Sequence, residues 1–392
     1  MQSPTKLITK YSYVAGALAF LSSIILFRLK SFGDFPKKLK QINIHLIIFA
    51  ILNFGILVQQ PFIIQLYNDS GYSNLQMIIL YFIPYIIKKA IKVIITNDME
   101  IQYPKFMVAF SSIALLNATF IRNSKSLKVH ILCTFLDGFG LYFGDLFIDD
   151  SEFGFDNFNK ETNNVYIHMK SIIKIICIFI AGFTGNYISK FFSIGFVFYF
   201  AAGCFFSVLP LILLLDSSIT FMIPKQPNKK SPTIFHVCYC IFTAALIILV
   251  NFEPIIINTK IGSDQFIDIF SLFSYFYYLS ISISEILIRM FDKNNLCIGP
   301  STIAIFLLFI SAEMKQTFHQ LNMMFISLLL MSISYNCFKK IVFRSKIEKL
   351  LIFLISFILV VLITLVSDEI VFYIIPLLVA VANCIFIFSY LL

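Results

Sequence analysis

Residues 191–251 read FFSIGFVFYFAAGCFFSVLPLILLLDSSITFMIPKQPNKKSPTIFHVCYCIFTAALIILVN. Two apolar runs, 191–216 and 233–251, flank a polar stretch that holds three lysines and three prolines. Each run is long enough to cross a hydrocarbon core of about 30 Å as a helix. The polar stretch 217–232 is therefore predicted to be a loop between two membrane-spanning helices.

Apolar runs of this kind recur along the whole chain. Of the 392 residues, 59% are apolar and 13% are charged, whereas a soluble domain carries about 25% charged residues. The sequence therefore predicts an all-α polytopic membrane protein. The predicted spans are residues 11–27, 42–66, 75–97, 104–121, 127–148, 165–188, 191–216, 233–251, 265–288, 298–314, 320–337, 347–367 and 370–391.

The basic residues between these segments alternate from side to side. Counted from the span that begins at 42, one set of connections holds 17 Lys and Arg and the opposite set holds 6. Cytoplasmic loops are the ones enriched in Lys and Arg. The linker 28–41 and the loops 217–232 and 338–349 are therefore predicted to be cytoplasmic. The opposite set is Arg122, Lys125, Lys128, Lys190, Lys260 and Lys315.

The central polar loop divides the twelve main spans into two equal groups. We expect an N-terminal six-helix bundle over 42–216, a cytoplasmic linker over 217–232 and a C-terminal six-helix bundle over 233–392. Residues 1–41 are expected to form one extra N-terminal helix and a basic linker, although segment 11–27 also fits a helix lying on the membrane surface. Two such bundles are the plan of the major facilitator superfamily, whose substrate site lies between the halves.

Four polar side chains in the N-terminal half are predicted to bind a solute. Ionisable groups within apolar helices are costly and mark functional sites. Lys174 lies about two turns inside its segment, and Lys88 follows Pro84 in the second span. Gln59 and Gln60 are adjacent amides within the run 42–66. The alternative for the lysines is that they reach to the membrane interface along their apolar stems.

Three carboxylates are candidates for proton coupling or for structural salt bridges. Asp145 and Asp149 are one helical turn apart at the end of the segment 127–148, and Glu285 lies in the segment 265–288. The two aspartates could instead pair with Lys170 or Lys174 on the following helix. Glu285 could pair with Arg289, four residues further along.

Nothing in the sequence indicates a cofactor, a metal site or a nucleic-acid surface. Almost all of the eight cysteines fall within apolar segments, where they behave as small buried residues. The net charge of +9 is spread among the membrane segments, as topology signals are.

Three stretches between residues 45 and 190 resemble the folate–biopterin transporter family of the major facilitator superfamily. They are the turn Asp69-Ser-Gly71-Tyr-Ser73, the pattern Pro84-Tyr85-Ile-Ile-Lys88, and Asp145-x-x-x-Asp149. The chain departs from the family pattern where Tyr85 replaces tryptophan and Lys89 replaces proline. The resemblance covers the N-terminal half only, and it implies secondary transport of folates or pterins.

Three functions remain open at this point. The leading hypothesis is a secondary active transporter that moves a small anionic solute by alternating access, with a proton as a candidate partner. The competing hypotheses are a polytopic enzyme of the endoplasmic reticulum, such as a lipid or glycosyl transferase, and a membrane scaffold. All three place the chain in a membrane, either the plasma membrane or an internal one, and the sequence leaves the oligomeric state open.

Overall fold

The computed structural model describes most of the chain beyond residue 38. The described residues are 39–94, 104–148, 154–155, 160–215, 221–222, 233–251, 293–313, 317–341, 346–364 and 368–391, with six more between 276 and 284. The predicted span 11–27 and most of the span 265–288 lie outside them. Within these residues the chain divides into two compact units, with the boundary between Gln226 and Pro227.

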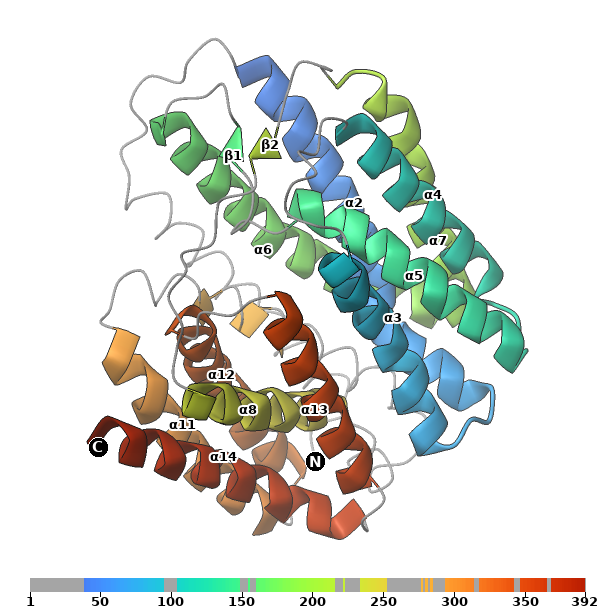
Figure 1. Ribbon diagram of the computed structural model, residues 1–392. Helices are drawn as coiled ribbons and strands as arrows, with labels where there is room; N and C mark the ends of the chain where they lie inside the picture. Colours follow the sequence, from blue (N-terminus) through green and yellow to red (C-terminus); the bar gives the residue numbers. More distant parts are fainter. Residues whose placement is uncertain are drawn as a thin grey trace. The chain divides into compact units, whose positions relative to one another are not determined.

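The N-terminal unit is built from six helices and one short strand pair. Strands β1 (Gly154–Phe155) and β2 (Phe221–Met222) pair antiparallel. The helices are α2 (Leu39–Asp69), α3 (Asn74–Ile94), α4 (Pro104–Ile121), α5 (Leu127–Ile148), α6 (Lys160–Phe191) and α7 (Ile194–Ile212) (Figure 1).

Five long helices are described in the C-terminal unit. They are α8 (Thr233–Asn251), α11 (Lys293–Glu313), α12 (Thr317–Ile341), α13 (Lys346–Thr364) and α14 (Asp368–Leu391). Each of the eleven helices corresponds to one predicted span, so the all-α fold class is confirmed within the described residues.

The same packing order occurs in both units. In the N-terminal unit α4 packs against α5 and α7, and α2 packs against α6 and α7. In the C-terminal unit α11 packs against α12 and α14, and α8 packs against α13 and α14. The helices of the two units can be matched in chain order: α2, α4, α5, α6 and α7 with α8, α11, α12, α13 and α14. Each of the four contacts named for the N-terminal unit then has its counterpart in the C-terminal unit. The described helices therefore pack in the same order in the two units.

The turn between α2 and α3 shows how local chemistry sets the helix ends. Gly71 has a positive φ of 76°, a conformation that glycine adopts without steric cost. The Ser73 backbone N–H donates to Gln76 Oε1 at 3.0 Å, and the Gln76 backbone N–H donates to Ser73 Oγ at 3.3 Å. This reciprocal pair is a capping box, and it fixes the start of α3.

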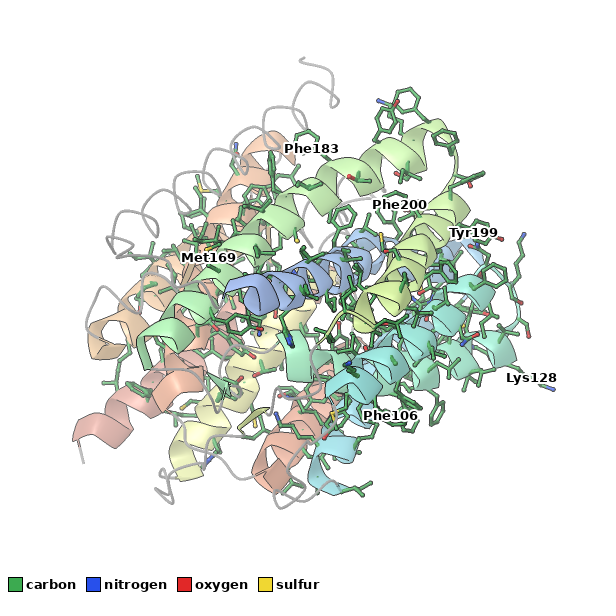
Figure 2. All side chains as sticks on the ribbon, turned by 90° about the horizontal axis from the view of Figure 1, so that it is seen from above. Phe106, Lys128, Met169, Phe183, Tyr199 and Phe200 are labelled. Carbon is green, nitrogen blue, oxygen red and sulfur yellow. The ribbon has the colours of Figure 1, made fainter. Side chains whose placement is uncertain are left out.

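Large apolar side chains cover the outside of the helices. Figure 2 shows Phe106 on α4, Phe183 on α6, and Tyr199 and Phe200 on α7 among these outer side chains, and all four are exposed. Four stretches within the described helices are long and apolar enough to cross a membrane: Ile44–Asp69, Ile172–Phe191, Ile194–Ile212 and Gln320–Phe338. Shorter apolar stretches occupy five further helices. An apolar exterior of this kind faces lipid, so the chain is an integral multi-pass membrane protein.

Candidate functional site: a charged cavity in the N-terminal unit

A small polar cavity lies among α2, α3, α4 and α5 of the N-terminal unit. Its volume is about 30 Å³, which is room for water or one small chemical group and not for a whole organic solute. Its lining residues are Ile56, Gln59, Gln60, Ile63, Tyr67, Leu80, Tyr81, Pro84, Tyr85, Leu115, Arg122, Asp137 and Leu141.

An ion pair between Arg122 and Asp137 dominates the chemistry of this cavity. Arg122 follows the last residue of α4 and is 0% exposed, and Asp137 in α5 is 6% exposed. The Arg122 Nη2 atom donates to Asp137 Oδ2. The guanidinium also lies over the ring of Phe198 from α7, 5.7 Å from its centroid. A buried charge pair in a membrane helix bundle is costly to maintain, and such residues typically serve a function.

The helix α5 carries Asp137 close to its neighbours because two glycines, Gly138 and Gly140, follow it. A Cβ atom added at Gly138 would lie 2.6 Å from the Cβ atom of Ile87 in α3, and one at Gly140 would lie 2.6 Å from Leu115 Cγ in α4. The Ser111 hydroxyl of α4 donates to the Gly140 carbonyl at 2.7 Å. These close approaches hold Asp137 at the junction of three helices.

Gln59 and Gln60, predicted from the sequence, both line the cavity. Gln59 Oε1 accepts from the Thr119 hydroxyl at 3.2 Å and from Arg122 Nη1 at 3.4 Å. Gln60 Nε2 donates to the Tyr85 hydroxyl. The two amides therefore connect α2 to both α3 and the end of α4, and Gln59 contacts the charged pair directly.

Two buried donors at the cavity have no hydrogen-bond partner among the described residues. They are the Tyr67 hydroxyl and the Arg122 Nε–H group. Buried polar groups are nearly always paired, so an unpaired one in a native structure points to a water, an ion or a ligand group. Both groups can donate to an oxygen atom, and they belong to residues that line the same cavity.

A histidine links the cavity to the turn before α3. His130 Nε2 lies 2.9 Å from the Arg122 carbonyl oxygen, and His130 Nδ1 lies 3.0 Å from the Tyr72 hydroxyl. The carbonyl can only accept, so Nε2 carries a proton. The Tyr72 hydroxyl is also 3.3 Å from the Lys125 carbonyl. This network fixes the backbone of Arg122 at the end of α4.

The other predicted site residues lie away from this cavity or outside the description. Lys88 on α3 and Lys174 on α6 are half-buried, and neither is among the lining residues. Lys170, considered as a salt-bridge partner, is 2% exposed and lies over the rings of Phe49 and Tyr166 at 5.0 and 5.3 Å. The side chain of Asp145, and all of Asp149 and Glu285, lie outside the described residues.

Sequence reasoning missed the two central residues of the cavity. Arg122 directly follows the apolar run 104–121, so it was counted among the loop charges. Asp137 lies ten residues inside the run 127–148, and this depth was the signal that could have identified it. An aspartate at that depth needs a partner, and Arg122 supplies the partner.

Comparisons with known proteins give the fold. The sequence matches no protein-family model, and it matches no curated protein sequence. The structure is similar to PepTSo, a transporter of the POT family, with a TM-score of 0.63 and 10% identity over 90% of this chain and 98% of that one. It is also similar to a bacterial metal transporter, with a TM-score of 0.60 and 13% identity over 89% and 98% of the two chains.

A third similar structure is the nucleoside transporter NupG, with a TM-score of 0.57 and 15% identity over 88% of this chain and 99% of that one. Each of these likenesses covers 88% or more of this chain. At such low identity they show the fold alone, which is the polytopic all-α fold predicted from the sequence.

Proposed function

We propose that this protein is a secondary active transporter of a small anionic solute, whose anionic group binds in the N-terminal cavity. The observation that carries this proposal is the Arg122–Asp137 pair, which is buried inside a bundle of membrane helices and lines a cavity. Stability alone does not explain a charged pair at this depth, because apolar residues of similar volume are often as stabilising or more so. The fold supports transport, since the similar structures named above are all transporters.

The cavity is suited to one group of the solute and not to its whole body. Its donors are Arg122 and the Tyr67 hydroxyl, and these favour a carboxylate or another anionic oxygen. In this fold, solute sites lie near the middle of the membrane and between the two repeats. We propose that residues 42–216 and 233–392 are these repeats, that 217–232 joins them, and that they move by alternating access.

Folates and pterins are the solute class that the sequence resemblance favours. The turn that carries Gly71 and Ser73 is one of the three resembling stretches, and its glycine conformation and capping box give it a structural reason of its own. Lys88 and Lys174 remain predicted solute contacts outside the cavity. The competing enzyme hypothesis has no comparable support, since the similar structures named above are transporters.

The proposal can be tested by uptake into liposomes that contain the purified protein. Pterin-6-carboxylate and biopterin share a ring system, and only the first carries a carboxylate, so they form a matched pair of probes with and without charge. Folate and uridine complete the panel. We expect uptake of folate or pterin-6-carboxylate to exceed that of biopterin and uridine.

The variant that tests the cavity is Arg122→Gln, with Lys128→Gln as its control because Lys128 is an exposed cation on α5. Loss of a charged hydrogen bond to the solute should lower anion uptake by about 10-fold or more. Lys128→Gln should leave uptake unchanged. Absence of anion uptake by the wild-type protein, or equal uptake by Arg122→Gln at equal protein levels, would contradict the proposal.

A further inference from the structure

The Arg122–Asp137 pair is neutral as a whole, and this restricts how an anion can bind beside it. Both residues are more than nine-tenths buried. Asp137 already accepts a hydrogen bond from one guanidinium nitrogen, Nη2. An anionic solute group that approached the same guanidinium would leave the cavity with a net negative charge in the interior of the membrane protein, where an uncompensated charge is costly.

We propose that Asp137 takes up one proton when the anionic group of the solute binds Arg122, so that the protein couples solute entry to proton entry. This inference rests on the proposed function and identifies its coupling residue. In the empty cavity the charges are one guanidinium and one carboxylate. In the loaded cavity they are one guanidinium and one solute anion, with Asp137 as a neutral carboxylic acid. The cavity is neutral in both states, and one proton moves with each anionic group.

The cavity provides partners for both states. In the loaded state the unpaired Tyr67 hydroxyl and the Arg122 Nε–H group can donate to the oxygens of the solute. The protonated Asp137 becomes a donor itself. Gln59 Oε1 is an acceptor that already lies 3.4 Å from Arg122 Nη1, so it is available when the guanidinium turns to the solute. In the exchange the solute oxygens replace Asp137 as the acceptor for Arg122 Nη2.

Asp137 is the group that takes the proton because of what surrounds it. Among the described residues that line the cavity it is the one carboxylate. The titratable and charged groups that face it come from α2, α3, α5 and the end of α4. They are Tyr67, Tyr81, Tyr85, Cys133, His130 and Arg122. The tyrosines and the cysteine are neutral near pH 7, and His130 is engaged at both nitrogens outside the cavity lining.

The test uses proteoliposomes that contain a pH-sensitive dye, with folate and pterin-6-carboxylate as the added probes. In the wild type, either probe should enter faster when the outside is acidic, and its entry should acidify the lumen by one proton per anionic group bound. Uptake of a probe without acidification would overturn this inference and leave the proposed function standing. Uptake of neither probe would contradict the proposed function and this inference with it.

The variant Asp137→Asn separates binding from coupling. Its side chain resembles the protonated acid, so exchange of labelled for unlabelled folate across the membrane should continue while acid-driven uptake and lumen acidification are lost. Glu313→Gln is the control, because Glu313 is an exposed carboxylate at the end of α11, and it should behave as the wild type. Acid-driven uptake by Asp137→Asn would overturn the inference.

If Asp137→Asn does not insert into the membrane, a second variant at the same position replaces it. Asp137→Glu keeps the carboxylate and should keep lumen acidification, with a changed dependence of uptake on pH. An unchanged pH dependence in Asp137→Glu would count against Asp137 as the proton carrier, because a carboxylate moved by one methylene group meets a different environment. The wild-type stoichiometry tests proton coupling itself even if every variant fails to fold, and the variants test Asp137 as the proton carrier.

Discussion

Arg122 and Asp137 come from neighbouring helices, are 15 positions apart in the chain, and meet inside the protein. Neither charged side chain would be stable in the protein interior without the other. Removing one partner of a buried ion pair leaves an uncompensated charge and costs about 3–5 kcal/mol, whereas replacing both partners costs much less. The stability and the function of the pair can therefore be separated by mutation.

We expect Arg122→Gln and Asp137→Asn each to lower the free energy of unfolding by about 3–5 kcal/mol. The double variant should recover most of this loss, because it leaves no unpaired charge. Thermal unfolding of the three variants in detergent gives the comparison, with Lys128→Gln as a control for loss of an exposed cation. A double variant as unstable as the sum of the two single ones would show that the residues are not coupled.

The same variants distinguish a structural pair from a binding pair. If the pair only stabilises the bundle, the double variant should regain anion uptake together with stability. We expect it to regain stability and to remain inactive, because the guanidinium that binds the solute is gone. Uptake normalised to inserted protein is the measurement, and full uptake by the double variant would remove the cavity from the transport mechanism.

At the scale of the helices, small residues decide where the cavity can form. Gly138 lies beside Asp137, and its hydrogen faces the Ile87 side chain and the Pro84 carbonyl of α3. Gly203 on α7 is an exposed glycine in a helix, and a Cβ atom there would meet nothing within 4 Å. Both glycines therefore lie in helices, but Gly138 is closely packed and Gly203 is not.

Gly138→Ala should destabilise the protein by about 1–3 kcal/mol, since the added methyl group would lie 2.6 Å from the Ile87 Cβ atom and 3.0 Å from the Pro84 oxygen. Gly203→Ala should be neutral or stabilising, because alanine favours the helix and fits the space. The midpoints of thermal unfolding test both. Equal midpoints would mean that α3 and α5 can separate without cost.

Helix positions followed from the sequence because membrane helices are defined by apolar length. The predicted runs 104–121, 127–148 and 233–251 have the same bounds as α4, α5 and α8. The prediction for α6 began at 165, whereas the helix begins at Lys160. Hydropathy locates the part of a helix that lies in lipid, and polar residues such as those at 160–164 extend the helix beyond it.

The candidate site followed from the sequence only in part. Gln59 and Gln60 were conspicuous as amides within an apolar run, and both line the cavity. Arg122 was assigned to a loop because it follows the run directly, and Asp137 was passed over in favour of Asp145. Their pairing depends on how α4 packs against α5, which hydropathy does not specify.

At the scale of the whole chain, the same packing order occurs in both units. The N-terminal set of helix contacts recurs in the C-terminal unit, helix for helix, among the described elements. The two repeats have different interiors, since the C-terminal unit places a stacked Tyr239–Tyr335 pair, with hydroxyls 2.7 Å apart, between α8 and α12. The two units therefore share a packing order but differ in their internal contacts.

The charge pattern predicts that the loop 217–232 between the two units lies on the cytoplasmic side of the membrane. A cysteine placed at Gln226→Cys, in the loop 217–232, should react with a membrane-impermeant maleimide only after the cells are permeabilised. Lys125→Cys is the matched position, because Lys125 is exposed in the turn between α4 and α5 and belongs to the opposite set of connections. It should react in intact cells.

Labelling is measured against the wild-type background, which should be low because most of the described cysteines are buried in the helices. Three helices, α5, α6 and α7, separate the two positions in the chain, and an odd number of crossings places them on opposite sides. Reaction of Gln226→Cys in intact cells, or equal reaction of both positions, would contradict the predicted topology. The inference about Asp137 depends only on the interior of the N-terminal unit, so an inverted topology would leave its chemistry unchanged.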